Sequence, residues 1–242
     1  MSGFAPNGVA GEPHTRLVIG VMGSASGPID AATAAVARCL GRAIAEAGCT
    51  LITGGCPGLP QEAVLGAHAA GGLVVGISPA LSETEHVTRY GSPIEGFDIM
   101  VYTGSGLMGR EVVNIRSSDI VVIIGGQSGT LGEFAIAFDE GRLIGVLSGT
   151  GGIADLVPEL LDRLTKDTGS TVLQDRDPAR LIERLVEHYQ TVHFRRPHRF
   201  ADDVVGSAQS RRTRSPKAGS TLFQPSSASI RPRNTADASG SP

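Results

Sequence analysis

The sequence predicts a single α/β domain in which a doubly wound parallel sheet carries helices on both faces. Short apolar runs alternate with longer helical patterns along most of the 242 residues, which is the order of a repeated βαβ unit. The runs are apolar at consecutive positions, as strands buried on both faces of a parallel sheet require. Apolar residues make up 40% of the chain, which is enough for one ample core and excludes a wholly disordered protein.

The alternation sets the expected elements in order. Seven apolar runs predict strands, at residues 17–22, 50–53, 73–77, 98–102, 120–124, 143–147 and, with the weakest pattern, 171–173. Six intervening stretches are long enough for crossover helices, at residues 30–47, 60–70, 107–117, 131–140, 153–165 and 178–192. Together they predict one Rossmann-like domain over residues 16–192.

The two ends of the chain are expected to lack a fixed structure. Residues 1–15 form a predicted flexible N-terminus. Residues 193–242 are rich in Ser, Pro and Ala, have no apolar periodicity, and carry nine basic and three acidic side chains, a net charge of +6. A basic disordered tail can hold a nucleic acid or an acidic partner. The pattern favours a solvated extension, and the net charge of −3 for the whole chain makes a nucleic-acid partner an unfavoured expectation.

The cysteine count and the apolar run lengths predict the compartment. Cys39, Cys49 and Cys56 are an odd number without CxxC spacing, so neither a disulfide framework nor a zinc site is expected. No run approaches the roughly 20 apolar residues that span a bilayer, and the first residues do not resemble a signal peptide. The expectation is a cytoplasmic protein with no membrane partner and no metal.

Glycine-rich loops follow four of the predicted strands. In a parallel sheet the carboxyl ends of the strands share one edge, where exposed backbone N–H groups and helix N-termini suit a phosphate. The candidate phosphate- or nucleotide-binding residues are Gly23, Ser24, Gly54, Gly55, Gly58, Thr103, Gly104, Gly126, Gly129 and Thr130. Each loop alone is equally explained as a tight turn. Neither GxGxxG nor GxxxxGK[ST] occurs, so NAD binding and Walker-type hydrolysis are disfavoured.

Two charged residues stand beside these loops, at the start of predicted helices. Arg110 is a candidate phosphate ligand, and Glu133 is a candidate catalytic carboxylate. Glu133 also follows Thr130 at the spacing of a capping box, and Arg110 could face only solvent or a neighbouring acid. Cys56 is better explained as a small residue in a tight turn than as a nucleophile. Two histidines, His68 on a helix and His86 in a loop, have no ligand-like spacing and fit core or surface positions.

The motifs resemble those of the LOG ("lonely guy") family, formerly labelled lysine decarboxylases, over residues 16 to about 165. The matching segments are Val21-Met22-Gly23-Ser24, Thr53-Gly54-Gly55-Cys56-Pro57-Gly58-Leu59, Gly71-Gly72-Leu73-Val74-Val75-Gly76-Ile77-Ser78-Pro79, Met108-Gly109-Arg110 and Gly126-Gln127-Ser128-Gly129-Thr130-Leu131-Gly132-Glu133. LOG enzymes hydrolyse the N-glycosidic bond of cytokinin riboside 5′-monophosphates without a metal or cofactor. The resemblance implies that Arg110 and Glu133 are catalytic, that Gly129 and Thr130 bind phosphate, and that the protein is a homodimer or a higher homo-oligomer.

Three positions depart from the LOG pattern. Gly125-Gly126-Gln127 stands where those enzymes carry Pro-Gly-Gly, Glu111 stands where they carry Lys, and Gly132 replaces an acid. Thr103-Gly104, before the predicted helix that carries Arg110, and Gly125-Gly126, after the fifth predicted strand, look more like a neighbouring branch that includes the molybdenum cofactor carrier proteins.

Two functions therefore remain open, both with a small phosphorylated ligand as partner. The first, which the sequence favours over the second, is a phosphoribohydrolase that cleaves a nucleoside 5′-monophosphate to base and ribose 5-phosphate, because both Arg110 and Glu133 are present. The second is a nucleotide or molybdenum cofactor carrier without turnover. For self-association the sequence offers the helix at 30–47 and apolar positions that would equally fit the core of one chain, Phe134, Ile136, Ala137 and Phe138.

Overall fold

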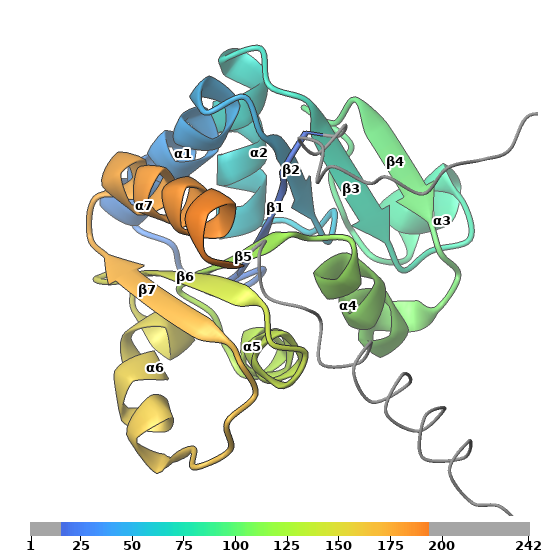
Figure 1. The fold of residues 1–242 in the computed structure, drawn as a ribbon. Coiled ribbons are helices and arrows are strands. Elements are labelled where there is room, and N and C mark those ends of the chain that lie inside the picture. The colour runs from blue at the N-terminus through green and yellow to red at the C-terminus, as the bar shows by residue number, and fades with distance from the viewer. Residues whose placement is uncertain (1–15, 194–242) are drawn as a thin grey trace, which may run out of the picture. The chain divides into compact units, whose positions relative to one another are not determined.

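The computed structural model describes residues 16–193, which form a seven-stranded parallel sheet with helices on both faces (Figure 1). The strands are β1 (Val18–Gly23), β2 (Thr50–Thr53), β3 (Val74–Ser78), β4 (Ile99–Tyr102), β5 (Ile120–Ile124), β6 (Leu143–Leu147) and β7 (Thr171–Asp175). The helices are α1 (Ala31–Glu46), α2 (Leu59–Ala69), α3 (Glu83–Thr88), α4 (Gly106–Arg116), α5 (Ser128–Asp139), α6 (Gly152–Arg163) and α7 (Pro178–Thr191). The segment 1–15 and almost all of the basic tail lie outside the described residues.

The predicted fold class is confirmed, and the main differences from the prediction are two element boundaries and one additional helix. Strand β7 continues to Asp175, and α5 begins at Ser128 instead of residue 131. Helix α3 was not predicted, because its six residues are too few to show an apolar period. Its N-terminus is fixed by Ser82, whose side chain accepts a hydrogen bond from the backbone N–H of Glu85.

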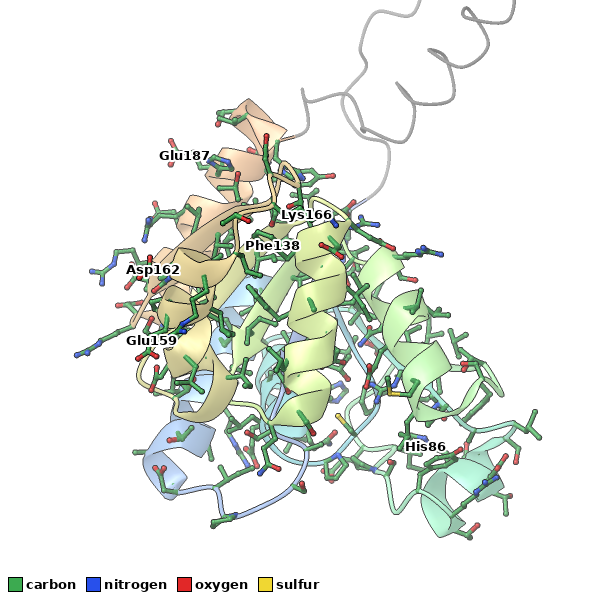
Figure 2. The ribbon with its side chains drawn as sticks, turned by 90° about the horizontal axis from the view of Figure 1, so that it is seen from below. His86, Phe138, Glu159, Asp162, Lys166 and Glu187 are labelled. Carbon is green, nitrogen blue, oxygen red and sulfur yellow. The ribbon has the colours of Figure 1, made fainter. Side chains whose placement is uncertain are left out.

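Two separate apolar cores lie on the two faces of the sheet. Helices α1, α2 and α7 cover one face, with Leu40 and Leu181 fully buried, and α4, α5 and α6 cover the other. Phe134 and Ala137 of α5 belong to the second core, and Ile136 and Phe138 pack against it, so these residues are intrachain core. Figure 2 shows Phe138 on α5 and the acidic side chains Glu159 and Asp162 on α6, which are exposed.

Helices α1 and α2 pack closely because each has a glycine where the backbone of the other helix approaches it. A Cβ atom at Gly41 would lie 1.8 Å from the carbonyl oxygen of Ala63, and one at Gly66 would lie 2.0 Å from that of Arg38. Any side chain at either position would push the helices apart. This close approach anchors the start of α2, which borders the site described below.

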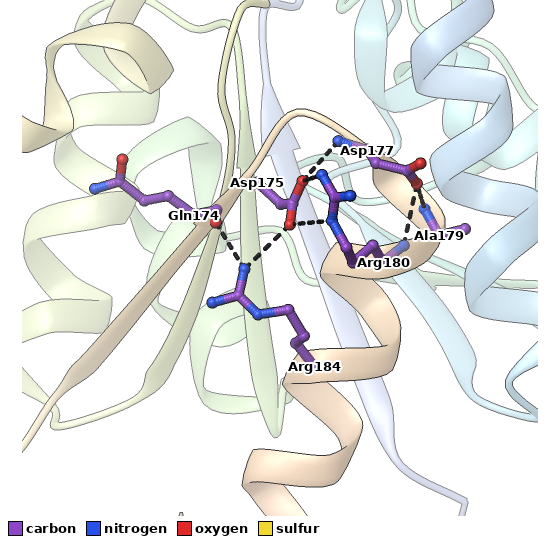
Figure 3. A network of polar contacts seen from close by, with 6 residues as sticks. All are labelled: Gln174, Asp175, Asp177, Ala179, Arg180 and Arg184. Atoms are coloured by element: carbon purple, nitrogen blue, oxygen red, sulfur yellow. Dashed lines mark hydrogen bonds and ion pairs between the residues drawn. The ribbon is translucent and has the colours of Figure 1, made fainter.

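An ionic network fixes the junction between β7 and α7 (Figure 3). The carboxylate of Asp175 accepts hydrogen bonds from Arg180, Arg184 and the backbone N–H of Asp177. The side chain of Asp177 in turn caps α7 by accepting from the backbone N–H groups of Ala179 and Arg180. The hydrogen bond from Arg180 is the main reason why the pKa of Asp175 lies far below its usual value of 3.8.

The strand order is β4-β3-β2-β1-β5-β6-β7, so β2 to β4 extend the sheet on one side of β1 and β5 to β7 extend it on the other. The point between β1 and β5, where the order of connection switches sides, is the topological switch point. These two strands are paired up to their last residues, Gly23 and Ile124, so the loops that follow them leave the sheet side by side. In open α/β sheets this switch point is where ligands bind. No helix among residues 16–193 is long and apolar enough to cross a membrane.

Candidate functional site at the switch point

Ser24 holds together the three loops that follow β1, β2 and β5. Its hydroxyl accepts a hydrogen bond from the backbone N–H of Gly126 at 2.7 Å, and its carbonyl accepts one from Leu59 at 2.9 Å. The loop before α2 can approach this closely because residue 58 is glycine: a Cβ there would lie 2.1 Å from the Ser24 carbonyl oxygen. The three loops therefore form one rim with fixed spacing.

A cavity of about 200 Å³ opens within this rim, bordered by α4 and α5. Seven of the predicted site residues line it: Gly23, Ser24, Gly54, Arg110, Gly129, Thr130 and Glu133. Gly58 and Gly126 contact Ser24 behind it, and Gly55 donates its N–H to the Thr53 hydroxyl.

Two predicted site residues lie elsewhere. Thr103 and Gly104, in the loop after β4, are not among the residues that line this cavity. The Thr103 hydroxyl donates to the carbonyl of Ser78 instead, and Gly104 donates to that of Ala80. The structure thus assigns the β4–α4 loop to the edge of the sheet.

Helix α5 begins at the cavity without a side-chain cap. Its N-cap residue, Gln127, makes no capping hydrogen bond, so the first N–H groups of the helix are available to a ligand. The alternative that Thr130 and Glu133 form a capping box is wrong, because the helix begins at Ser128 and Thr130 already lies inside it. The positive end of the α5 dipole therefore faces the cavity.

Arg110 brings a buried guanidinium to the same cavity from α4. The residue is only 7% exposed, and its Nε has no hydrogen-bond partner in the described part of the chain. The guanidinium lies against residue 54, where a Cβ would stand 1.2 Å from its Nη1 atom, so glycine is needed there to leave it room. Arg110 forms no ion pair within 4.0 Å with any carboxylate in the described part of the chain. No carboxylate among these residues therefore neutralises its charge in a direct ion pair.

Two buried carboxylates border the cavity beside Arg110. Burial raises the pKa of Glu133 from 4.5 to about 7; the positive charge of Arg110 opposes this shift, and the negative charge of Glu111 adds to it. Burial also raises the pKa of Glu111, again opposed by Arg110. Near neutral pH, Glu133 can therefore exchange a proton with water or with a bound molecule.

Among the lining residues that the predicted site omitted, two have ionisable side chains, Glu111 and Cys56. The buried face of α4 contains the polar residues Arg110, Glu111 and Asn114, a spacing of i, i+1 and i+4 that could have signalled a polar interior face. The pKa of Cys56 is raised to about 11, chiefly by burial. A thiol with this pKa is protonated at neutral pH, which supports the interpretation of Cys56 as a small turn residue.

The two histidines have structural positions. His86 lies on α3 and not in a loop as expected, and it is fully buried (Figure 2). Its ring nitrogens contact the hydroxyl of Ser78 at 2.8 Å and the carbonyl of Pro93 at 3.0 Å. His68 is exposed on α2. Within residues 16–193, no group of three or more His, Cys, Asp or Glu side chains is placed to hold a metal ion.

Similarity to known proteins agrees with this architecture. An uncharacterized protein from Archaeoglobus fulgidus is 36% identical over 129 residues, which cover 53% of this chain and 78% of that protein. The molybdenum cofactor binding protein from Rippkaea orientalis has a similar structure, with a TM-score of 0.61 and 30% identity over 74% of this chain and 100% of that one. The molybdenum cofactor carrier protein from Chlamydomonas reinhardtii also has a similar structure, with a TM-score of 0.57 and 30% identity over 72% of this chain and 98% of that one.

The resemblance to the LOG-like superfamily, near its molybdenum cofactor carrier branch, is confirmed by these likenesses. A family model describes the chain from residue 16 to residue 182, and so includes every strand of the sheet, the switch-point cavity and both cavity-lining helices. The chain therefore belongs to the SLOG cluster4 family.

Proposed function

We propose that this protein binds a phosphorylated small ligand in the switch-point cavity. The observation that carries the proposal is the pairing of the uncapped α5 N-terminus with the buried, incompletely bonded guanidinium of Arg110. Backbone N–H groups and a guanidinium are the two donor types that phosphate oxygens bind most strongly in proteins. Among the predicted residues, Gly129 and Thr130 supply backbone donors of the first turn, and Arg110 supplies the counter-charge.

The proposed role is that of a carrier, which holds its ligand without turnover. Two similar structures, each covered almost entirely by this chain at 30% identity, are named for binding or carrying the molybdenum cofactor. Here that cofactor is cargo, and its phosphate would take the place between α5 and Arg110. The carboxylate of Glu111, at the position where the LOG enzymes carry lysine, also separates this cavity chemically from theirs.

A second candidate function is hydrolysis of a nucleoside 5′-monophosphate, favoured by the position of Glu133. Breaking the C1′–N bond leaves the electron pair on the base, which takes up a proton, and positive charge on the ribose. An ionised carboxylate stabilises that charge and accepts a proton from the water that bonds to C1′. Because the pKa of Glu133 is about 7, such turnover would rise as the pH passes through neutrality.

One set of measurements tests the binding proposal and separates the two functions. The protein is titrated with a panel of nucleoside 5′-monophosphates, the matching nucleosides and the molybdenum cofactor, and the monophosphate mixtures are analysed for free base. Arg110→Ala should lower the affinity for the phosphorylated ligands far more than the affinity for the nucleosides. Equal loss for both would refute the phosphate role.

The free-base analysis decides between carrier and enzyme. Binding without release supports the carrier. Release that Glu133→Gln lowers by about a hundredfold or more, while affinity is unchanged, supports the enzyme. Glutamine keeps the size of the side chain and removes its charge. Glu159→Gln on the outer face of α6 is the matched control.

We also infer self-association, through the face where β4 and α4 leave apolar side chains exposed. Ile99 and Val101 of this edge strand are 50% and 42% exposed, and Leu107 and Met108 of α4 are 55% and 74% exposed. A parallel sheet normally has helices over both faces, so a second copy of the chain would cover what the fold leaves open here. This surface differs from the α5 positions considered in the sequence.

A further inference from the structure

Glu111 is a buried carboxylate whose hydrogen-bonding capacity the protein does not use. It is 6% exposed, it lines the cavity, and its Oε2 atom has no partner in the described part of the chain. Its oxygens lie against the first turns of α5, at 3.7 and 3.5 Å from where Cβ atoms of Gly129 and Gly132 would stand. A buried acceptor without a donor is costly, and a ligand that supplies the donor recovers that cost.

A ligand consisting of phosphate alone would not suit this cavity. Arg110 supplies one positive charge, whereas two carboxyl groups line the same cavity, Glu111 from α4 and Glu133 from α5. A phosphate held by α5 and Arg110 would gain nothing from Glu111. The part of the ligand that reaches Glu111 must instead carry hydrogen-bond donors.

We propose that Glu111 determines specificity, by accepting hydrogen bonds from a heterocycle that has a ring N–H next to an amino group. A carboxylate has two acceptor oxygens and pairs with two adjacent donors, as it does with a guanidinium. The 2-amino-4-oxopyrimidine edge, which guanine and pterins share, offers this arrangement. The inference rests on the proposed function, because it requires that α5 and Arg110 hold the phosphate of the same ligand in this cavity.

The test compares GMP with IMP, which differ only by the 2-amino group. We expect the unaltered protein to bind GMP about 10- to 100-fold more tightly than IMP in calorimetric titrations, the scale of a lost hydrogen bond to a charged acceptor. Glu111→Gln should bring the two affinities to within about threefold, mainly by weakening GMP, since one acceptor oxygen becomes a donor. Glu159→Gln, an exposed substitution of the same kind, should leave the ratio unchanged.

The outcomes separate this inference from the proposed function. Equal binding of GMP and IMP by the unaltered protein would overturn the role of Glu111 while leaving the phosphate site intact. An equal gain for both nucleotides in Glu111→Gln would show that the carboxylate only repels phosphate, and would also overturn it. Failure of every phosphorylated probe to bind would refute the proposed function itself.

A titration with a pterin shows which of the two ring systems the site prefers. Neopterin monophosphate carries the same 2-amino-4-oxopyrimidine edge on a different ring system, so it should also lose affinity in Glu111→Gln. Tighter binding of this pterin than of GMP would assign the site to pterins, and the reverse order would assign it to guanine nucleotides. If Glu111→Gln binds both GMP and neopterin monophosphate as tightly as the unaltered protein does, the proposal is contradicted.

Discussion

Gly54→Ala should displace the guanidinium proposed to bind phosphate from the cavity, without a substitution at Arg110 itself. The backbone of Gly54 is outside the left-handed region, so alanine fits its conformation. The added Cβ would stand 1.2 Å from Nη1 and 2.4 Å from Cζ of Arg110, which is far inside any permitted contact. One of the two groups must move, and the end of a side chain moves at lower cost than the end of a central strand.

The expected loss of affinity follows from the bonds that the displaced guanidinium gives up. A hydrogen bond to a charged group contributes about 1.5–3 kcal/mol, so Gly54→Ala should lower the affinity for a 5′-monophosphate by about 10- to 150-fold. The matching nucleoside, which has no phosphate, should lose much less. Isothermal titration with AMP and adenosine measures both, and a thermal melt shows whether the variant remains folded.

Glu159→Gln is the control for this experiment, because its side chain is exposed on α6 and is not among the residues that line the cavity. If Gly54 acts only by making room for Arg110, then Gly54→Ala adds little to Arg110→Ala in the double variant. Fully additive losses, or a Gly54→Ala protein that binds AMP normally, would refute the reasoning.

Three further outcomes follow from the structure. Cys56 should react with iodoacetamide at pH 7.5 much more slowly than the exposed Cys39, because its pKa is about 11; mass spectrometry of the labelled peptides checks this. Asp175→Asn should lower the melting temperature at neutral pH. Since the folded-state pKa of Asp175 is depressed, that difference should shrink progressively as the pH falls below about 4 and vanish only below the folded-state pKa. Light scattering should detect dimers at micromolar concentration, and the double variant Ile99→Lys, Met108→Lys should be monomeric.

Much of the architecture was determined by the sequence itself. Strand positions follow from local apolar runs, because a strand buried on both faces needs apolar residues at consecutive positions. The glycine loops and the charged residues Arg110 and Glu133 could be assigned to the carboxyl edge for the same reason, since every parallel strand ends there. Helix α3 and the first turn of α5 could not, because neither has an apolar period.

Only the tertiary structure decided which of these loops share a cavity. All four glycine loops lie at one edge of the sheet, but the strand order puts β4 three strands from β1, so Thr103 and Gly104 lie away from the switch point. The burial of Glu111 likewise depends on how α4 packs against α5. Strand order and helix packing arise from contacts between segments far apart in the chain, and the local pattern of residues does not contain them.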